Sequence, residues 1–184
     1  MYKIKSLKKL LPFKYNNFEL RLINKEDIYW YINNFQSDYF NEFIDDDTVF
    51  KLPYEEIEYK LINLVLSYKM SISMSGEARL VYENRDTGEI VAGITIFEVG
   101  NNKVELGYWV IPSYQGKGIG KQIINNTLEV LQKMYLGYKV ILEIREDNIA
   151  SVKLAEGLGF KHIKNKSGKI KTNKIYELEV KNIE

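Results

Sequence analysis

The sequence of 184 residues contains no cysteine and one histidine, His162. Without cysteine it can form no disulfide, no thiolate nucleophile and no cysteine-based metal site. A single histidine cannot supply the imidazole ligands of a histidine-rich zinc site, and a lone histidine on a predicted strand is more often structural than catalytic. We therefore expect no metal and no thiol chemistry.

The sequence also lacks an excess of charge of either sign and any long apolar run. Its 26 Lys and Arg residues balance 25 Asp and Glu residues, and a net charge of +1 gives no argument for nucleic-acid binding. No apolar run approaches the roughly 18 residues that span a bilayer. Leu10 and Leu11 are followed at once by Pro12, so the apolar segment of a signal peptide is missing. We expect a cytoplasmic protein that binds neither nucleic acid nor membranes.

The composition is that of an ordinary soluble globular protein, with 45% hydrophobic and 28% charged residues. No linker, repeat or low-complexity block divides the chain, which is long enough to bury one sizeable core. We predict a single domain over residues 1–184, with residues 1–16 as a short N-terminal extension packed on it.

Hydrophobic periodicity predicts a run of strands interrupted by helices. Such an order favours an α+β fold with a mixed, mainly antiparallel sheet flanked by helices. The predicted strands are residues 18–23, 78–83, 90–99, 104–111, 139–145, 161–164 and 174–180, and the predicted helices are residues 24–35, 55–72, a segment after residue 118 and a segment that begins at Asn148.

Three glycines, Gly116, Gly118 and Gly120, stand between a predicted strand and a predicted helix. Glycine allows a tight turn and a close approach of the backbone to a ligand. The first amides of a helix have no partner within it and lie at the positive end of its dipole. The junction is therefore suited to bind a phosphate or pyrophosphate.

The spacing of this loop excludes two common phosphate-binding motifs. A P-loop needs a longer loop and a lysine followed by serine or threonine, and in the dinucleotide fingerprint the third glycine comes later. The segment from Gln115 to Gly120 instead matches the pattern Q/R-x-x-G-x-G/A. It resembles the acetyl-CoA pyrophosphate loop of the GNAT acyltransferase superfamily.

Two further segments extend the resemblance over residues 18–160. Residues 148–151 and 153–160, with Asn148, Ser151, Glu156 and Phe160, are similar to the N-x-x-S and E-x-L-G-F segments of the Rim-type branch, which includes ribosomal-protein N-terminal acetyltransferases. Residues 18–27 are similar to the opening strand and helix start of that branch. The resemblance implies a GNAT-type sheet whose splayed strands form an acetyl-CoA cleft.

The resemblance also implies how the chain would bind its cosubstrate, acetyl-CoA. Backbone amides at the end of the strand would bind the pantetheine arm and polarise the carbonyl, and Asn148 would hydrogen-bond the same arm. The residues so assigned are Tyr108, Trp109 and Val110 for the pantetheine, and Gln115, Gly116, Lys117, Gly118, Ile119, Gly120 and Lys121 for the pyrophosphate. The alternatives are a solvated glycine loop and, for Asn148, a polar residue at a helix start.

The implied reaction is direct attack of an amine on the acetyl thioester in a ternary complex. An alkyl amine has a pKa near 10, so it must lose a proton before it attacks. Strand alternation puts Glu105, Gly107 and Trp109 on one face, which would leave an open polar patch beside the thioester. Glu105 is the candidate base, directly or through a water relay. The alternative is a solvated or salt-bridged strand carboxylate.

The candidate acid departs from the commonest pattern of the superfamily. Many members have a tyrosine seven residues after the asparagine, where this chain has Ala155. In the Rim-type branch the serine three residues after the asparagine is the usual candidate, here Ser151. A serine hydroxyl can donate a hydrogen bond to the leaving sulfur. The alternative is that Ser151 is an ordinary polar residue at the start of a helix.

The acceptor is expected to be a protein N-terminus or a small-molecule amine, bound by a monomer or homodimer. An acidic rim for a cationic acceptor is one interpretation of several carboxylates, although a solvated surface explains them as well. These residues are Asp45, Asp46, Asp47, Glu55, Glu56 and Glu58, and the aromatic residues expected in the core and cleft wall are Trp30, Tyr31, Phe35, Tyr39, Phe40 and Phe43.

Two other functions stay open at this point. A non-catalytic acyl-CoA-binding module or sensor on the same fold would explain why Ala155 replaces the common tyrosine. A phosphate-binding regulatory domain unrelated to CoA would explain the glycine loop alone.

Overall fold

The computed structural model describes residues 3–35, 53, 55–56, 58–59, 62–63, 76–168 and 171–181. Eight strands form one sheet, and helices cover both of its faces. The elements are η1 (Lys3–Lys9), β1 (Phe13–Tyr15), β2 (Phe18–Leu22), α1 (Asp27–Phe35), β3 (Glu77–Asn84), β4 (Ile90–Gly100), β5 (Lys103–Val110), η2 (Pro112–Tyr114), α4 (Ile119–Tyr135), β6 (Lys139–Arg145), α5 (Ile149–Gly157), β7 (Lys161–Ser167) and β8 (Thr172–Glu179).

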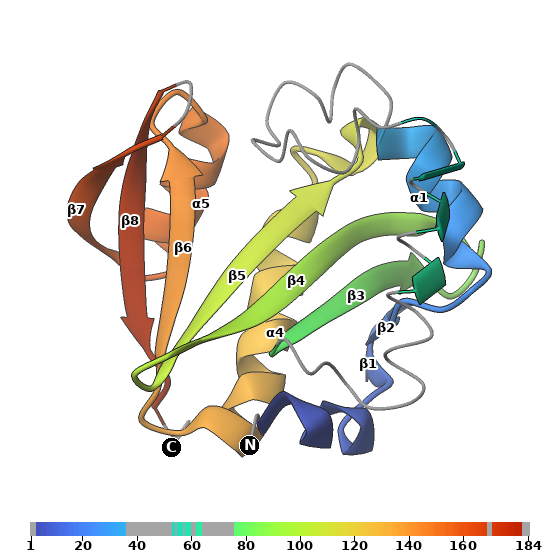
Figure 1. Cartoon of the computed structure of the whole chain (residues 1–184), viewed down its shortest axis with the longest axis horizontal. Coiled ribbons are helices and arrows are strands. Elements are labelled where there is room, and N and C mark those ends of the chain that lie inside the picture. Colours follow the sequence, from blue (N-terminus) through green and yellow to red (C-terminus); the bar gives the residue numbers. More distant parts are fainter. Residues whose placement is uncertain are drawn as a thin grey trace.

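The strands follow the order β1-β2-β3-β4-β5-β6-β8-β7 across the sheet (Figure 1). All neighbouring strands are antiparallel except β5 and β6, which run parallel. This arrangement confirms the predicted α+β class with a mixed, mainly antiparallel sheet.

The parallel neighbours β5 and β6 pair over only part of their length. Lys103 to Glu105 lie opposite Lys139 to Ile141, and no later residues of the two strands are paired. Both strands continue beyond this point, β5 to Val110 and β6 to Arg145. Figure 1 shows β5 and β6 diverging from a common lower end, so the sheet opens between them. The sheet thus has the splayed strands that the resemblance implied.

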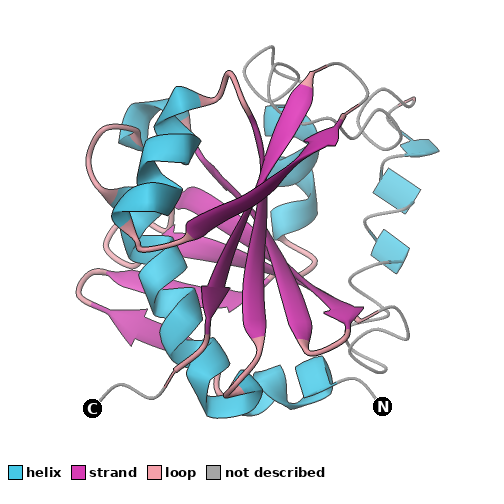
Figure 2. Cartoon of the chain, turned by 90° about the vertical axis from the view of Figure 1, so that its left-hand side faces the viewer, coloured by secondary structure: helices cyan, strands magenta, loops and turns pink. Residues whose placement is uncertain are grey.

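The helices divide between the two faces of the sheet (Figures 1 and 2). Helix α4 packs on β4, β5 and η1, and α5 packs on β6 and β7 of the same face. Alternate residues of β5 turn toward this core, since Val104 and Leu106 are buried, and Ile123 and Leu131 of α4 meet them there. Burial of this apolar surface is the main stabilising force. The opposite face carries α1 and the polar residues of β5.

The N-terminal residues are part of this core. Ile4 and Leu7 of η1 are fully buried, and β1 pairs with β2 at one edge of the sheet. The Glu98 carboxylate accepts a hydrogen bond from the Ile4 amide (2.8 Å) and another from the Tyr135 hydroxyl. Glu98 therefore joins η1 and the end of α4 to the sheet, a role that the sequence does not indicate.

Asn24 caps the start of α1. The side-chain oxygen of Asn24 accepts hydrogen bonds from the amides of Glu26 (2.9 Å) and Asp27 (3.2 Å), and the Asp27 carboxylate accepts one from the Asn24 amide (2.8 Å). This reciprocal arrangement satisfies donors that a helix start otherwise leaves without acceptors. The predicted helix of residues 24–35 is confirmed from Asp27 onward.

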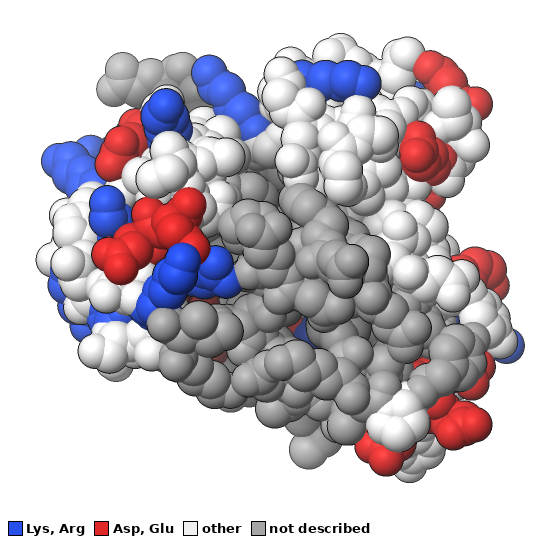
Figure 3. Space-filling view, turned by 90° about the horizontal axis from the view of Figure 1, so that it is seen from above, with Lys and Arg blue, Asp and Glu red and all other residues white. Residues whose placement is uncertain are grey.

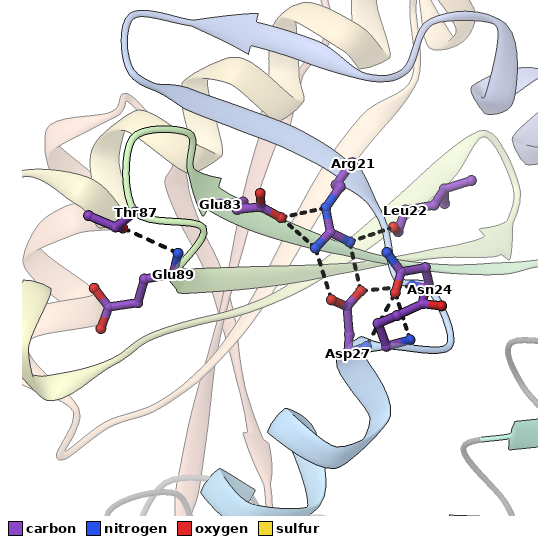
Figure 4. Close-up of polar contacts among 8 residues, drawn as sticks. Arg21, Leu22, Asn24, Asp27, Glu83, Thr87 and Glu89 are labelled. Atoms are coloured by element: carbon purple, nitrogen blue, oxygen red, sulfur yellow. Dashed lines mark hydrogen bonds and ion pairs between the residues drawn. The ribbon is translucent and has the colours of Figure 1, made fainter.

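Arg21 of β2 fixes α1 to the sheet (Figure 4). Its guanidinium donates to both oxygens of Asp27, at 2.7 and 2.9 Å, and to Glu83 of β3 at 2.5 and 2.8 Å. Burial opposes the charge of Arg21, but the two carboxylates raise its pKa above the usual value. The bidentate geometry sets the direction in which α1 leaves the sheet.

Most predicted strands agree with the structure within two residues at each end. The C-terminal hairpin differs, because β7 extends to Ser167 and β8 begins at Thr172, so its tip is shorter than predicted. Six positions of the predicted helix 55–72 are described and helical, while its other positions and residues 36–50 lie outside the described residues. The second group includes Tyr39, Phe40, Phe43 and Asp45 to Asp47.

Candidate active site

Glu105 stands on the open face of β5 at the last pair before β5 and β6 diverge. Val104 and Leu106 on either side of it are buried in the core, as strand alternation predicts. Burial raises the pKa of the Glu105 carboxyl, the negative charge of Glu143 raises it further, and Lys166 opposes both. A carboxylate with a raised pKa is a better proton acceptor than an ordinary glutamate.

Beyond Glu105, the same face of β5 carries Gly107, which has no side chain, and then Trp109. A Cβ added to Gly107 would meet no atom of the described residues within 4 Å, and Gly107 is exposed. Trp109 follows on the same face and lies directly over Gly93, where a Cβ would come within 2.4 Å of the indole. Trp30 of α1 stacks on Trp109 with ring centroids 5.1 Å apart. Glu105, Gly107 and Trp109 therefore lie in a row on one face of β5, with the carboxylate and the indole on either side of Gly107.

A polar cluster faces Glu105 from the other side of the opening. Glu143 of β6 accepts hydrogen bonds from Lys166 of β7 (2.8 Å) and from Asn173 of β8 (2.7 Å). Burial raises the pKa of Glu143, but these two donors outweigh it and hold the pKa below the usual value. Sequence reasoning missed this cluster, although a charged residue within the apolar segment 139–145 is a signal that could have indicated it.

The glycine loop has the backbone conformation that the motif predicts. Gly116 and Gly118 adopt left-handed φ values of 69° and 80°, and among the described residues no atom lies within 4 Å of a Cβ built on either. Gly118 is the N-cap of α4, and no side chain in the described ranges caps this helix start. The first intrahelical acceptor is the Gly118 carbonyl, which bonds the amide of Gln122 at 3.0 Å. The amides of residues 119–121 are thus placed for an anion.

Other residues of the loop have contacts within the protein. The side-chain amide of Gln115 donates to the Val110 carbonyl (3.0 Å) and ties the loop to the end of β5. Gly120 allows α4 to approach α5, since a Cβ there would lie 3.0 Å from Leu154. Ile119 is buried, so only its backbone can reach a ligand. The ammonium of Lys117 lies 5.2 Å from the Tyr114 ring centroid, and Lys121 is exposed.

The three residues predicted to bind pantetheine do not point their amides the same way. The Ile111 amide donates to Val91 of β4 (3.0 Å). Because amides alternate along a strand, the Trp109 amide also points toward β4, and those of Tyr108 and Val110 point toward β6. Tyr108 and Val110 lie beyond the last β5–β6 pair, so their amides face the opening.

The start of α5 borders the opening from the side of β6. The Asn148 side chain accepts a hydrogen bond from the Ser151 amide (3.1 Å) and is the N-cap of this helix. Within the described part of the chain the hydroxyl of the half-buried Ser151 makes no hydrogen bond. Ala155 is fully buried in the core, at the position where many superfamily members carry a tyrosine.

Other features lie away from Glu105. His162 is exposed on the face of the sheet opposite Glu105, where its ring hydrogen-bonds Asn165 (2.9 Å) and contacts the ring of Tyr176. A shallow hollow of about 560 Å³ lies between α4 and the turn from β1 to β2, and its lining includes Tyr15, Asn16, Gly118 and Lys121. In the described ranges no three His, Asp or Glu side chains come together as a metal site, and no helix is long and apolar enough to cross a bilayer.

Comparison with known proteins agrees with this geometry. The sequence model of the Acetyltransferase (GNAT) family matches residues 31–160. No curated protein matches the chain in sequence. The fold is similar to that of ribosomal-protein-S5-alanine acetyltransferase from Vibrio fischeri, with a TM-score of 0.75 and 18% identity over 91% of this chain and 95% of that chain. It is also similar to spermidine N-acetyltransferase from Vibrio cholerae in complex with CoA and spermine, with a TM-score of 0.72 and 20% identity over 89% and 96% of the two chains.

Proposed function

The chain belongs to the GNAT family of acetyltransferases, and from this premise we propose that it transfers an acetyl group from acetyl-CoA to a primary amine by direct attack in a ternary complex. Acetyl-CoA supplies an acetyl group activated as a thioester. The observation that carries the proposal is the position of Glu105, a carboxylate with a raised pKa at the point where β5 and β6 diverge.

The residues around the opening have separate tasks in this proposal. The uncapped start of α4, with Gly116 and Gly118 before it, binds the pyrophosphate through backbone amides, and Lys117 and Lys121 add positive charge. The amides of Tyr108 and Val110 orient the pantetheine arm. The side-chain oxygen of Asn148 is already used as the cap of α5. The exposed Gly107, which has no side chain, admits the amine.

Glu105 accepts the proton that the amine must lose, directly or through one water. As pH falls through the raised pKa of Glu105, the carboxylate is protonated and activity is lost. Loss therefore begins at a higher pH than for an ordinary glutamate. The Ser151 hydroxyl donates a hydrogen bond to the departing sulfur in this scheme, since Ala155 offers no polar group.

The acceptor is a protein N-terminus or a small-molecule amine. The similar structures include an acetyltransferase named for an alanine of ribosomal protein S5 and one named for spermidine, so both acceptor types occur on this fold. Two carboxylates at the opening, Glu105 and Glu143, favour a cationic acceptor over an anionic one.

A non-catalytic acyl-CoA sensor is the second candidate, and the buried Ala155 favours it. The two functions are separated by isothermal titration with acetyl-CoA together with release of free CoA thiol across N-terminal peptides, polyamines and aminoglycosides. The enzyme binds acetyl-CoA and releases thiol faster with at least one amine than without any. A sensor binds acetyl-CoA and shows no amine-dependent release with any member of the panel.

A further inference from the structure

We propose that Glu143, held by Lys166 and Asn173, is a positioning residue that keeps Glu105 ready to accept the proton of the acceptor amine. This inference rests on the proposed function, in which Glu105 is the base. The group crosses four strands of one sheet face: Glu105 on β5, Glu143 on β6, Asn173 on β8 and Lys166 on β7.

The carboxylate of Glu143 is fixed through both oxygens. Lys166 donates to Oε2 at 2.8 Å, and Asn173 donates to Oε1 at 2.7 Å. Asn173 is only 7% exposed, so its amide cannot turn away into solvent. Lys166 belongs to the edge strand β7 and reaches over Asn173, its partner in the strand pairing, to meet Glu143. Two donors from two strands therefore hold one carboxylate in place.

The strand register brings Glu143 to the same face as Glu105. Ile141 lies opposite Glu105 in the last pair of β5 and β6, and Glu143 follows two residues later. Residues two apart on a strand share a face. The two carboxylates thus stand on either side of the opening, one on each half of the divided sheet.

Besides burial, the negative charge of Glu143 raises the pKa of Glu105. The donors Lys166 and Asn173 keep the pKa of Glu143 low despite burial, so Glu143 stays ionised over the range in which Glu105 titrates. A fixed negative charge disfavours a second one nearby, and this adds to burial in raising the pKa of Glu105, while Lys166 works against it.

Most of the remaining charges of this face are paired. Lys164 of β7 lies opposite Ile175 on the same face, and its positive charge also lowers the pKa of Glu143. Figure 3 shows acidic and basic side chains together on the side of β6, β7 and β8. Around Glu105 the described charged neighbours are Lys103 and Lys139 with Glu177 between them, Glu77 with Arg79 on β3, and Asp147 with Arg145 and Lys171. From α1, Trp30 stacks on Trp109 on this face. From across the opening, Glu143 is the carboxylate whose negative charge raises the pKa of Glu105.

The test uses variants of two residues in contact, Glu143 and Lys166, which must shift the pH dependence of kcat/KM in opposite directions. Glu143→Gln removes the negative charge and leaves the ammonium of Lys166, so the acidic limb of the kcat/KM profile moves to lower pH. Lys166→Met removes the positive charge and leaves Glu143, so the limb moves to higher pH. At a pH below the limb Glu143→Gln is therefore faster than Lys166→Met when each rate is taken relative to that variant's own plateau. Lys166→Arg keeps the wild-type limb.

Lys161→Met is the matched control, because Lys161 is an exposed lysine on the same face of the same strand. Lys166 is 57% exposed, so its variant folds even where Glu143→Gln does not. A carbon NMR titration of the Glu105 carboxyl measures the same shifts without turnover, and so reports on Glu143 even if no amine is acetylated. Opposite displacements of the Glu105 midpoint support the inference. Wild-type midpoints in both variants, or displacements of one sign, overturn it.

Discussion

At the scale of single residues, two glycines of neighbouring strands have opposite surroundings. Gly93 lies under the indole of Trp109, whereas no described atom lies within 4 Å of a Cβ built on Gly107. Alanine at position 93 must therefore displace Trp109 and its stacking partner Trp30. The first glycine serves packing, and the second leaves room for a ligand.

Gly93→Ala should lower the free energy of unfolding by about 1–3 kcal/mol, as expected for overpacking. Gly107→Ala should change it by less than about 0.5 kcal/mol and instead raise KM for the amine, because the methyl group takes up space between Glu105 and Trp109. Thermal denaturation and steady-state kinetics of both variants measure this. The chain has two tryptophans, Trp30 and Trp109, so fluorescence reports directly on their stack. Equal stability of the two variants would contradict the assigned surroundings.

The hydrogen bond from the Ser151 amide to the Asn148 side chain separates the structural role of Asn148 from the proposed catalytic role of the Ser151 hydroxyl. Asn148 accepts from the backbone of Ser151, so the serine hydroxyl is not the cap of α5. Asn148→Ala should cost about 1 kcal/mol of stability through loss of the cap. Ser151→Ala should leave the melting temperature unchanged and slow the chemical step about 10- to 100-fold, the effect of one lost transition-state hydrogen bond. A Ser151→Ala variant with wild-type turnover would remove serine from the mechanism and leave water as the proton donor.

At the scale of elements, the start of α4 is the feature on which cosubstrate binding depends. Gly118→Glu should nearly abolish acetyl-CoA binding in isothermal titration, since the added side chain blocks the backbone and its charge repels the pyrophosphate. Gly88→Glu is the matched control, because Gly88 also has a positive φ (71°) and open surroundings but lies in the turn between β3 and β4. Both variants carry the same backbone strain. Equal CoA affinity of the two folded proteins would show that the loop does not bind CoA.

The attachment of helix α1 to the sheet depends on the ion pair between Arg21 and Asp27. Arg21→Met leaves the buried carboxylate of Asp27 without its guanidinium. We expect a loss of about 3 kcal/mol in the free energy of unfolding, the usual cost of removing one partner of a buried ion pair. The exposed Arg85 supplies the control variant Arg85→Met, with an expected change below about 0.5 kcal/mol. Urea denaturation of both variants tests this, and similar losses in the two would contradict the role of Arg21.

At the scale of the whole molecule, local patterns predicted most elements and the glycine loop. Alternation along residues 104–111 placed Glu105 on the open face, and the predicted helix of residues 24–35 contains α1. The roles that the sequence could not indicate depend on contacts between distant segments. Glu143 meets Lys166 only because β8 lies between their strands, and Trp109 lies on Gly93 only in the register of β4 with β5. Periodicity carries no information about such register.

The central claim is that Glu105, where the sheet divides, takes the proton from an amine acceptor. The most direct measurement is kcat/KM of Glu105→Gln as a function of pH, with Glu77→Gln on the same sheet face as control. We predict a loss of about 10- to 1000-fold at neutral pH, a smaller change in CoA affinity, and a gap that narrows as pH rises and the amine deprotonates unaided. Wild-type turnover of Glu105→Gln at neutral pH would contradict the account and leave Glu105 as a strand residue.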